Sequence, residues 1–120
     1  MTSKFYRTTM CHNLACLVGV SESIFLQNIL ELSDLNRMTD DYKYFVDNYW
    51  WLCASYKTLL DEMPFFNNTE KIKRMIKRLE SSGYLISFTP RGIDKTKWYR
   101  VNVDMITKEF NAQKITYIDF

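Results

Sequence analysis

The chain has 120 residues, of which 47% are hydrophobic and 16% aromatic. This composition suits one globular domain with a modest core and argues against a disordered protein. No window reaches the ~20 apolar residues of a membrane-spanning helix, and no basic start with an apolar run indicates a signal peptide. We therefore expect a soluble, cytoplasmic protein without a membrane contact. The formal net charge is only +2, so its distribution along the chain is more informative than its size.

Two helices are predicted at the beginning of the chain. Thr8 or Thr9 can cap a helix over about 10–18, and Ser21 can cap a second helix over about 22–35. These assignments rest on the preference of Ser and Thr side-chain oxygens for the unpaired N–H groups at a helix start. The main apolar face of the second helix consists of Ile24, Phe25, Ile29, Leu32 and Leu35.

The second helix also carries a further apolar stripe. Leu26 and Leu30 lie one turn apart and away from the main apolar face. A helix with two apolar sides is either covered by another element of its own chain or takes part in an interface. The stripe therefore leaves two interpretations open, simple burial and a homodimer formed through this helix.

An aromatic stretch follows a polar break at residues 36–41. Residues 42–53 contain six Tyr, Phe and Trp residues with the turn-forming pair Asp47–Asn48 among them, which predicts a short hairpin or a loop leading into a strand. Aromatic rings can stack on single-stranded bases, but only Lys43 is interleaved here, so core packing is the favoured role. The neighbouring acids Asp40 and Asp41 are interpreted as solvated loop residues.

A short helix is predicted over residues 56–62, with Ser55 as its cap. Pro64 prevents its continuation, because proline lacks an N–H group and its ring clashes with the preceding turn. Phe65 and Phe66 then follow, and we expect them to pack between this helix and the next.

The clearest amphipathic pattern lies between residues 67 and 83. Its apolar residues recur at i, i+3, i+4 and i+7, and they are Ile72, Met75, Ile76 and Leu79. Its cations occupy the remaining helix surface, and they are Lys71, Lys73, Arg74, Lys77 and Arg78. Asn67, Asn68 or Thr69 can cap the helix start, and Gly83 suits the left-handed position after its end.

The last part of the chain predicts a β-hairpin and a C-terminal extension. A strand over 84–89 is followed by a turn at 90–92 and by a second strand over 98–103 with period-2 alternation. That alternation places Tyr99, Val101 and Val103 on one face and Trp98, Arg100 and Asn102 on the other. Asp104 can cap a short helix to Phe110, and residues 114–120 can form a strand. We assign residues 1–103 to one domain and residues 104–120 to an extension packed on it.

The order of helix, turn, basic helix and hairpin predicts an α+β, mainly helical fold, a winged helix-turn-helix with three to four helices and a β-hairpin wing. Charge is also unevenly distributed along the chain, with the excess of cations on the predicted basic helix and hairpin. Residues 71–100 carry nine Lys and Arg against two Asp and Glu, a net +7, whereas residues 1–70 carry five against nine, a net −4. A basic helix beside a basic hairpin indicates a polyanionic partner, double-stranded DNA.

Helix-turn-helix docking places the start of the second helix against base edges in the major groove and the wing along the backbone or in the minor groove. The candidate DNA-binding residues are Tyr56, Lys57, Asn67, Asn68, Thr69, Lys71, Lys73, Arg74, Lys77, Arg78, Arg91, Lys95 and Lys97. The alternative for the helix alone is a basic face that is merely solvated.

Nothing in the sequence supports catalysis or metal binding. The three glycines are dispersed, so no phosphate-binding loop is present, and one histidine gives no catalytic triad. The three cysteines form no C-x-x-C pair, and we interpret them as reduced thiols. We expect a protein that is not an enzyme and that needs no cofactor or metal ion.

Several of these residues also resemble a known family. The spaced residues Trp51, Ser55 and Tyr56, the helix end Leu79-Glu80-x-x-Gly83 and the strand Lys97-Trp98-Tyr99-Arg100 are similar to those of N-terminal winged-helix domains of phage and plasmid replication proteins. Replisome organisers and DnaD-type primosomal proteins of Gram-positive bacteria and their phages are the nearest types, over about residues 5–103.

The resemblance implies sequence-specific binding of origin DNA in replication initiation of a phage or plasmid. It also implies assembly into dimers or larger complexes and contact with a replication or host protein. Two alternatives remain open on the sequence. The first is a winged-helix transcriptional regulator, and the second is a phage accessory protein, such as an inhibitor of a host defence nuclease, that acts through a protein contact.

Overall fold

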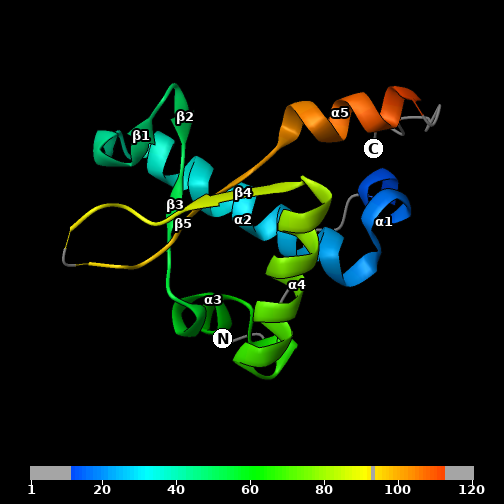
Figure 1. Ribbon diagram of the computed structural model, residues 1–120, viewed down its shortest axis with the longest axis horizontal. Helices are drawn as coiled ribbons and strands as arrows, with labels where there is room; N and C mark the ends of the chain where they lie inside the picture. Colours follow the sequence, from blue (N-terminus) through cyan, green and yellow to red (C-terminus); the bar gives the residue numbers. More distant parts are fainter. Residues whose placement is uncertain (1–11, 93, 113–120) are drawn as a thin grey trace, which may run out of the picture.

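The computed structural model describes residues 12–92 and 94–112 (Figure 1). The predicted cap at Thr8 or Thr9 and the predicted strand over 114–120 lie outside the described residues. The helices are α1 (His12–Val18), α2 (Val20–Met38), α3 (Tyr56–Glu62), α4 (Thr69–Ser82) and α5 (Val103–Ala112), with 3-10 turns η1 (Tyr42–Tyr44) and η2 (Pro64–Phe66). The strands are β1 (Phe45–Val46), β2 (Tyr49–Trp50), β3 (Leu52–Cys53), β4 (Leu85–Phe88) and β5 (Trp98–Val101).

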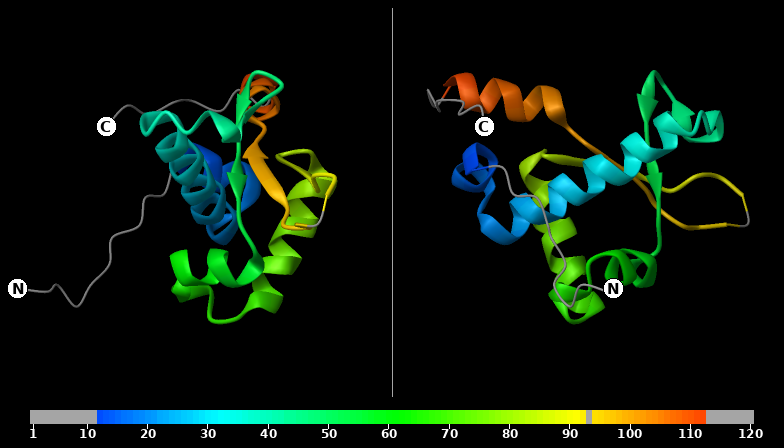
Figure 2. Two further views of the ribbon diagram at one scale, coloured as in Figure 1. Left: turned by 90° about the vertical axis from the view of Figure 1, so that its left-hand side faces the viewer. Right: turned by 180° about the vertical axis from the view of Figure 1, so that it is seen from behind.

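A three-stranded antiparallel sheet in the order β3-β5-β4 forms the wing and its base. Leu52 pairs with Tyr99 across β3 and β5, and Leu85 pairs with Val101 across β4 and β5. Viewed from the side, β3 and β5 run between α2 and α4 (Figure 2, left). The sheet therefore joins the scaffold helix α2 to the basic helix α4, and the predicted α+β, mainly helical winged-helix fold is confirmed.

The β1–β2 hairpin is a separate projection between α2 and β3. Its strands pair at Phe45 with Trp50 and at Val46 with Tyr49. Asp47 and Asn48 have φ angles of 54° and 66°, and two successive positive φ angles are those of a type I′ turn, which Asn and Asp tolerate. The sequence left open a short hairpin or a loop leading into a strand, and the structure has the hairpin.

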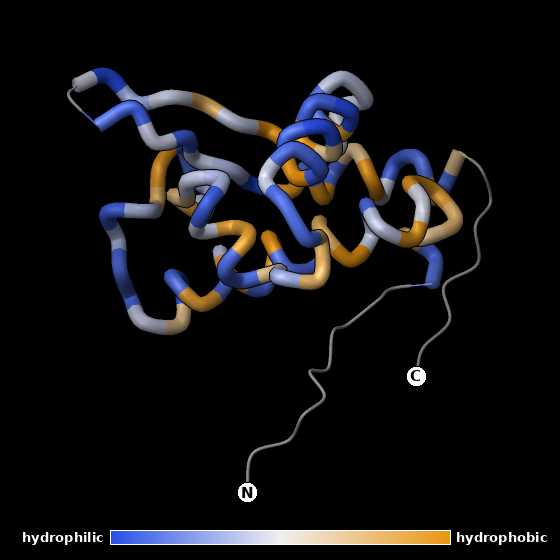
Figure 3. The backbone as a smooth tube through the Cα atoms, turned by 90° about the horizontal axis from the view of Figure 1, so that it is seen from below, coloured by the Kyte–Doolittle hydropathy of each residue, from blue (hydrophilic) through white to orange (hydrophobic). Residues whose placement is uncertain are grey.

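The apolar seam of α4 is buried as predicted. Ile72 and Ile76 are 0% and 1% exposed, and Met75 and Leu79 are also buried. They pack with residues of α2, α3 and the sheet, including Phe25, Leu59 and Tyr99, in one continuous core. In Figure 3 the helices alternate between apolar and polar colouring along the tube, as helices with one buried side do.

Helix α2 differs from its prediction in both its ends and its buried side. It begins at Val20 with Gly19 as the N-cap, in place of the predicted cap Ser21, and it continues to Met38 beyond the predicted end near residue 35. Its buried residues are Glu22, Ser23, Phe25, Leu26, Ile29 and Ser33. Leu35, predicted on the main apolar face, is 53% exposed, because the neighbouring elements contact the helix on a different side.

The leucine stripe of α2 is covered within the chain. Leu26 is 0% exposed, and Leu26 and Leu30 line a small cavity together with Leu14 of α1 and with Ile106 and Phe110 of α5. Simple burial under α1 and α5 therefore accounts for Leu26. Leu30 is only partly buried, and a homodimer through this helix stays a prediction.

Helix α5 begins one residue earlier than its predicted cap. The Asn102 side chain accepts a hydrogen bond from the Met105 N–H at 3.2 Å, so Asn102 caps the helix in place of Asp104. Val103 belongs to the helix and is 49% exposed, not on the buried face of the strand. Ile106 and Phe110 anchor α5 in the common core. None of the described helices is long and apolar enough to cross a membrane.

Candidate nucleic-acid interface

Local sequence features fix both ends of the basic helix α4. Asn67 adopts a positive φ of 74°, and the Asn68 side chain then accepts a hydrogen bond from the Lys71 N–H at 3.0 Å. Gly83 ends the helix in the left-handed conformation, with the Tyr84 N–H bonded to the Leu79 carbonyl at 3.0 Å. Of the three predicted caps, Asn68 is the one used, so its carboxamide oxygen is already engaged.

The cations of α4 point to two different sides of the helix. Lys71, Arg74 and Arg78 line a cleft against the first turn of α2. Lys73 lies on the opposite flank, where its Nζ is 5.2 Å from the centre of the Tyr56 ring. Lys77 is exposed and, at 100° per residue, falls between these flanks on the outer surface. The single basic face predicted from the sequence is thus divided.

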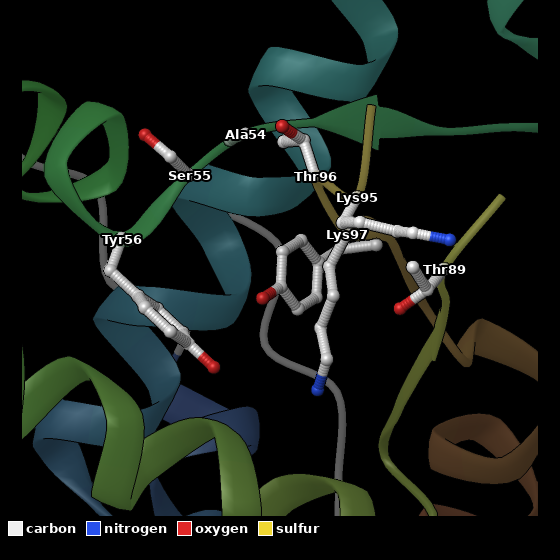
Figure 4. Close-up of a pocket in the computed structure, with 8 residues that line it drawn as sticks. Ala54, Ser55, Tyr56, Thr89, Lys95, Thr96 and Lys97 are labelled. Carbon is white, nitrogen blue, oxygen red and sulfur yellow. The ribbon is translucent and has the colours of Figure 1, made fainter. Parts of the chain in front are cut away.

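The Tyr56 flank of α4 faces a groove between α3 and the wing. The groove has a volume of about 520 Å³, and its lining residues are Ala54, Ser55, Tyr56, Thr89, Lys95, Thr96, Lys97 and Tyr99. Figure 4 shows Lys97 extending toward the ribbon of α4, while Lys95 is directed away from it. The predicted wing cations Lys95 and Lys97 and the predicted α3 residue Tyr56 therefore meet at one site.

Tyr99 forms the buried wall of this groove. Only 1% of its surface is exposed, and this burial, together with the adjacent Tyr56, raises the pKa of the Tyr99 hydroxyl. On the wing, the Asp94 carboxylate accepts hydrogen bonds from the Thr96 hydroxyl at 2.6 Å and from the Thr96 N–H at 2.9 Å. These two bonds lower the pKa of Asp94 and hold the segment that carries Lys95.

Three of the predicted DNA-binding cations are already paired with carboxylates. Lys73 lies 3.3 Å from Glu70, and Lys97 of the wing lies 3.9 Å from Glu80 of α4. Arg78 pairs with Glu22 of α2, whose side chain is only 9% exposed. Among the described residues, the predicted cations that form no ion pair are Lys57, Lys71, Arg74, Lys77, Arg91 and Lys95.

Sequence reasoning missed the acidic partners of these cations. Glu22 lies 56 residues before Arg78 in the chain, so no local spacing reveals the pair. Glu80 accepts a hydrogen bond from the Ser87 hydroxyl at 2.5 Å, which fixes it beside the wing. Arg100 was not a candidate, and the structure stacks it on the Tyr49 ring at 3.6 Å, away from the groove.

The described residues contain no group of three or more His, Cys, Asp or Glu side chains that could hold a metal ion. Exposed cations lie on α4 and on the wing, and the groove beside the wing is lined by Lys95 and Lys97 as well as by Tyr56 and Tyr99.

No protein-family model matches the sequence, and no curated protein matches it. One solved structure, described as the N-terminal domain of a DNA-binding protein, superposes with a TM-score of 0.57. The match covers 95% of this chain and 90% of that chain, at 18% sequence identity. The two chains share a fold. At this identity the likeness concerns the arrangement of the elements alone.

Proposed function

We propose that the chain binds double-stranded DNA, with α4 in the major groove and the wing along the backbone. The observation that carries the proposal is the presence of exposed cations both on α4 and on the wing beside the groove. Lys77 of α4 and Lys95 of the wing are exposed, and neither forms an ion pair with the described residues. The description of the superposed structure as part of a DNA-binding protein supports the same function.

Winged-helix docking explains the role of each part. Lys77 lies on the outer surface of α4, which is the surface that a recognition helix presents to the major groove of DNA. Lys57, Arg91 and Lys95 would bind phosphate groups and position the helix without reading sequence. Lys73 and Lys97 would exchange their carboxylate partners for phosphates. Ion pairs near the surface contribute little to stability, so breaking these two pairs costs little free energy.

The finer proposal is a role in replication initiation of a phage or plasmid. It is supported by the family resemblance of residues 51–56, 79–83 and 97–100, not by the geometry of the groove. A transcriptional regulator with the same fold would bind promoter DNA, whereas an initiator would bind repeats at an origin. Competition between such duplexes for the bound protein distinguishes the two roles.

The test is fluorescence anisotropy of a labelled duplex of random sequence at low and moderate salt. A protein that neutralises six phosphates should lose about a thousandfold in affinity between ~50 and ~200 mM salt. The Lys77→Glu/Lys95→Glu variant should bind much more weakly, and its salt slope should fall by about two.

A charge-matched control separates this site from overall charge. Arg37→Glu/Lys108→Glu changes the net charge by the same amount at two exposed positions on α2 and α5. It should keep its salt slope and most of its affinity. If the control and the Lys77→Glu/Lys95→Glu variant lose affinity equally, or if the native chain does not bind at low salt, the proposed interface is wrong.

A further inference from the structure

A projecting, acidic and aromatic arm follows the end of α2. The arm comprises residues 39–50, which contain η1 and the β1–β2 hairpin. Tyr42 is 64% exposed, and its ring lies 5.5 Å from that of Trp50, which in turn lies 5.0 Å from the Phe45 ring. The charged residues of the arm are Asp40, Asp41, Lys43 and Asp47, a net −2. A contiguous exposed aromatic patch of this kind marks an interaction surface.

A basic cleft with an apolar floor lies at the opposite end of α2. It has a volume of about 570 Å³, and its lining residues are Ser21, Glu22, Ile24, Phe65, Phe66, Lys71, Arg74, Met75 and Arg78. The three cations and Glu22 give the cleft a net +2. Phe65 is 46% exposed, so apolar surface is available between the charges. Its volume lies within the range of about 300–1,000 Å³ that is usual for binding pockets.

The arm cannot reach the cleft of its own chain. The cleft is formed against the first turn of α2, and the arm begins after the last residue of that helix. A helix of 19 residues is about 28 Å long. Figure 1 shows the hairpin at one end of α2 and α1, which precedes the start of α2, at the other. Any contact between arm and cleft is therefore a contact between two molecules.

We propose that the chain associates head to tail, with the arm of one copy docked in the basic cleft of the next. The two surfaces are complementary in charge and in polarity. The arm has a net charge of −2 and the cleft a net charge of +2, and the exposed aromatic rings of the arm face the apolar floor of the cleft. Because the two surfaces differ, the interface is heterologous, and repetition of it builds a ring or an open chain of copies. This assembly does not involve the leucine stripe of α2.

A second copy suits the cleft better than a DNA backbone does. Glu22 is part of the cleft and its side chain is only 9% exposed, so one cation is already neutralised there. The exposed Phe65 ring offers apolar contact, which a phosphate backbone does not use. The wing and the groove lie on the other flank of α4. The inference thus goes beyond the proposed DNA-binding function and does not rest on it.

A charge exchange between the two surfaces tests the proposal. In the arm variant, Asp41→Lys/Asp47→Asn changes the arm from −2 to +1, and Asn is tolerated at the positive φ of position 47. In the cleft variant, Lys71→Glu/Arg74→Glu changes the cleft from +2 to −2. Position 71 is the third residue of α4, where a glutamate also favours the helix.

Sedimentation velocity, measured without DNA from micromolar to millimolar concentrations, should show weak association of the native chain that high salt reverses. Each variant alone should associate at least tenfold more weakly, because like charges then face each other. A mixture of the two variants should associate again, since the +1 arm meets the −2 cleft and the native arm meets the native cleft. Recovery on mixing also shows that both variants are folded.

Three results would overturn the proposal. The first is a native chain that stays monomeric over the whole concentration range. The second is association that the cleft variant leaves unchanged, which would place the interface elsewhere. The third is loss of labelled-duplex binding in the cleft variant while the native chain remains a monomer, which would assign the cleft to DNA. Because association is measured without DNA, failure of the proposed DNA binding leaves its outcome unaffected.

Discussion

The ion pair between Glu22 and Arg78 should stabilise the protein more than the neighbouring cations of α4 do. It joins α2 to α4 across 56 residues of chain. Glu22 is almost buried, with a side chain only 9% exposed, whereas the Arg78 side chain is 64% exposed. Removing the arginine would leave a nearly buried carboxylate without its partner, and an unpaired buried charge is strongly unfavourable.

The exposures of the two side chains set the expected magnitude. Exposed pairs contribute about 0.2–1 kcal/mol, and breaking a fully buried pair costs about 3–5 kcal/mol. A pair with one buried and one exposed member falls between them, so we expect Arg78→Gln to lower the free energy of unfolding by about 1–2 kcal/mol. With a urea slope of about 2 kcal/mol per molar, the midpoint should fall by roughly half to one molar.

Urea unfolding followed by tryptophan fluorescence and circular dichroism measures this change. Lys77→Gln is the matched control, because Lys77 is adjacent and exposed, and it forms no ion pair with the described residues. It should change stability by less than about 0.5 kcal/mol. In a double-mutant cycle, Glu22→Gln combined with Arg78→Gln should destabilise less than the sum of the single changes.

Equal effects of Arg78→Gln and Lys77→Gln would refute this reasoning. The same result would show that the pair with Glu22 adds no stability, and that Arg78 can bind a phosphate without loss of stability. A coupling energy close to zero in the cycle would have the same meaning, since it would show that Glu22 and Arg78 act independently in the folded protein.

Two further predictions concern a glycine and a buried tyrosine. Gly19→Ala should destabilise by about 1–3 kcal/mol in urea unfolding, because φ is +100° and an added Cβ would lie 2.9 Å from the Glu22 carboxylate. Gly92→Ala, with nothing within 4 Å, should cost less. Burial raises the pKa of Tyr99 above the ordinary ~10, so the unfolded chain ionises first and stability falls above that pH. Tyr99→Phe should reduce this alkaline loss in melting experiments; an unchanged loss would exclude Tyr99 as its source.

Several parts of the fold that follow from local sequence were predicted correctly. The spacing of Ile72, Met75, Ile76 and Leu79 defines the buried side of α4, and Gly83 ends that helix. These features depend on neighbours within one helical turn, which the sequence displays directly. The same holds for Ser55, whose hydroxyl accepts a hydrogen bond from the Thr58 N–H at 3.1 Å.

The errors that concern burial occur where distant elements decide the outcome. The sequence of α2 offers two apolar sides, and only the positions of α1 and α5 show that Leu26 is buried and Leu35 exposed. Hydrophobic spacing identifies a helix but does not select between two such sides. The start of α5 was misplaced for a local reason, because Asn102 and Asp104 are both good caps and Asn102 is the one whose side chain bonds to the backbone.

The candidate interface shows the same limit in its charges. A count of cations along residues 71–100 predicts one basic surface, yet α4 turns Lys73 toward Tyr56 of α3 and Arg78 toward α2. Carboxylates from α2 and from α4 itself then neutralise part of that surface. What distinguishes a DNA-binding flank from a protein-binding flank is therefore the neighbour that each cation faces, and this depends on packing between elements far apart in the chain.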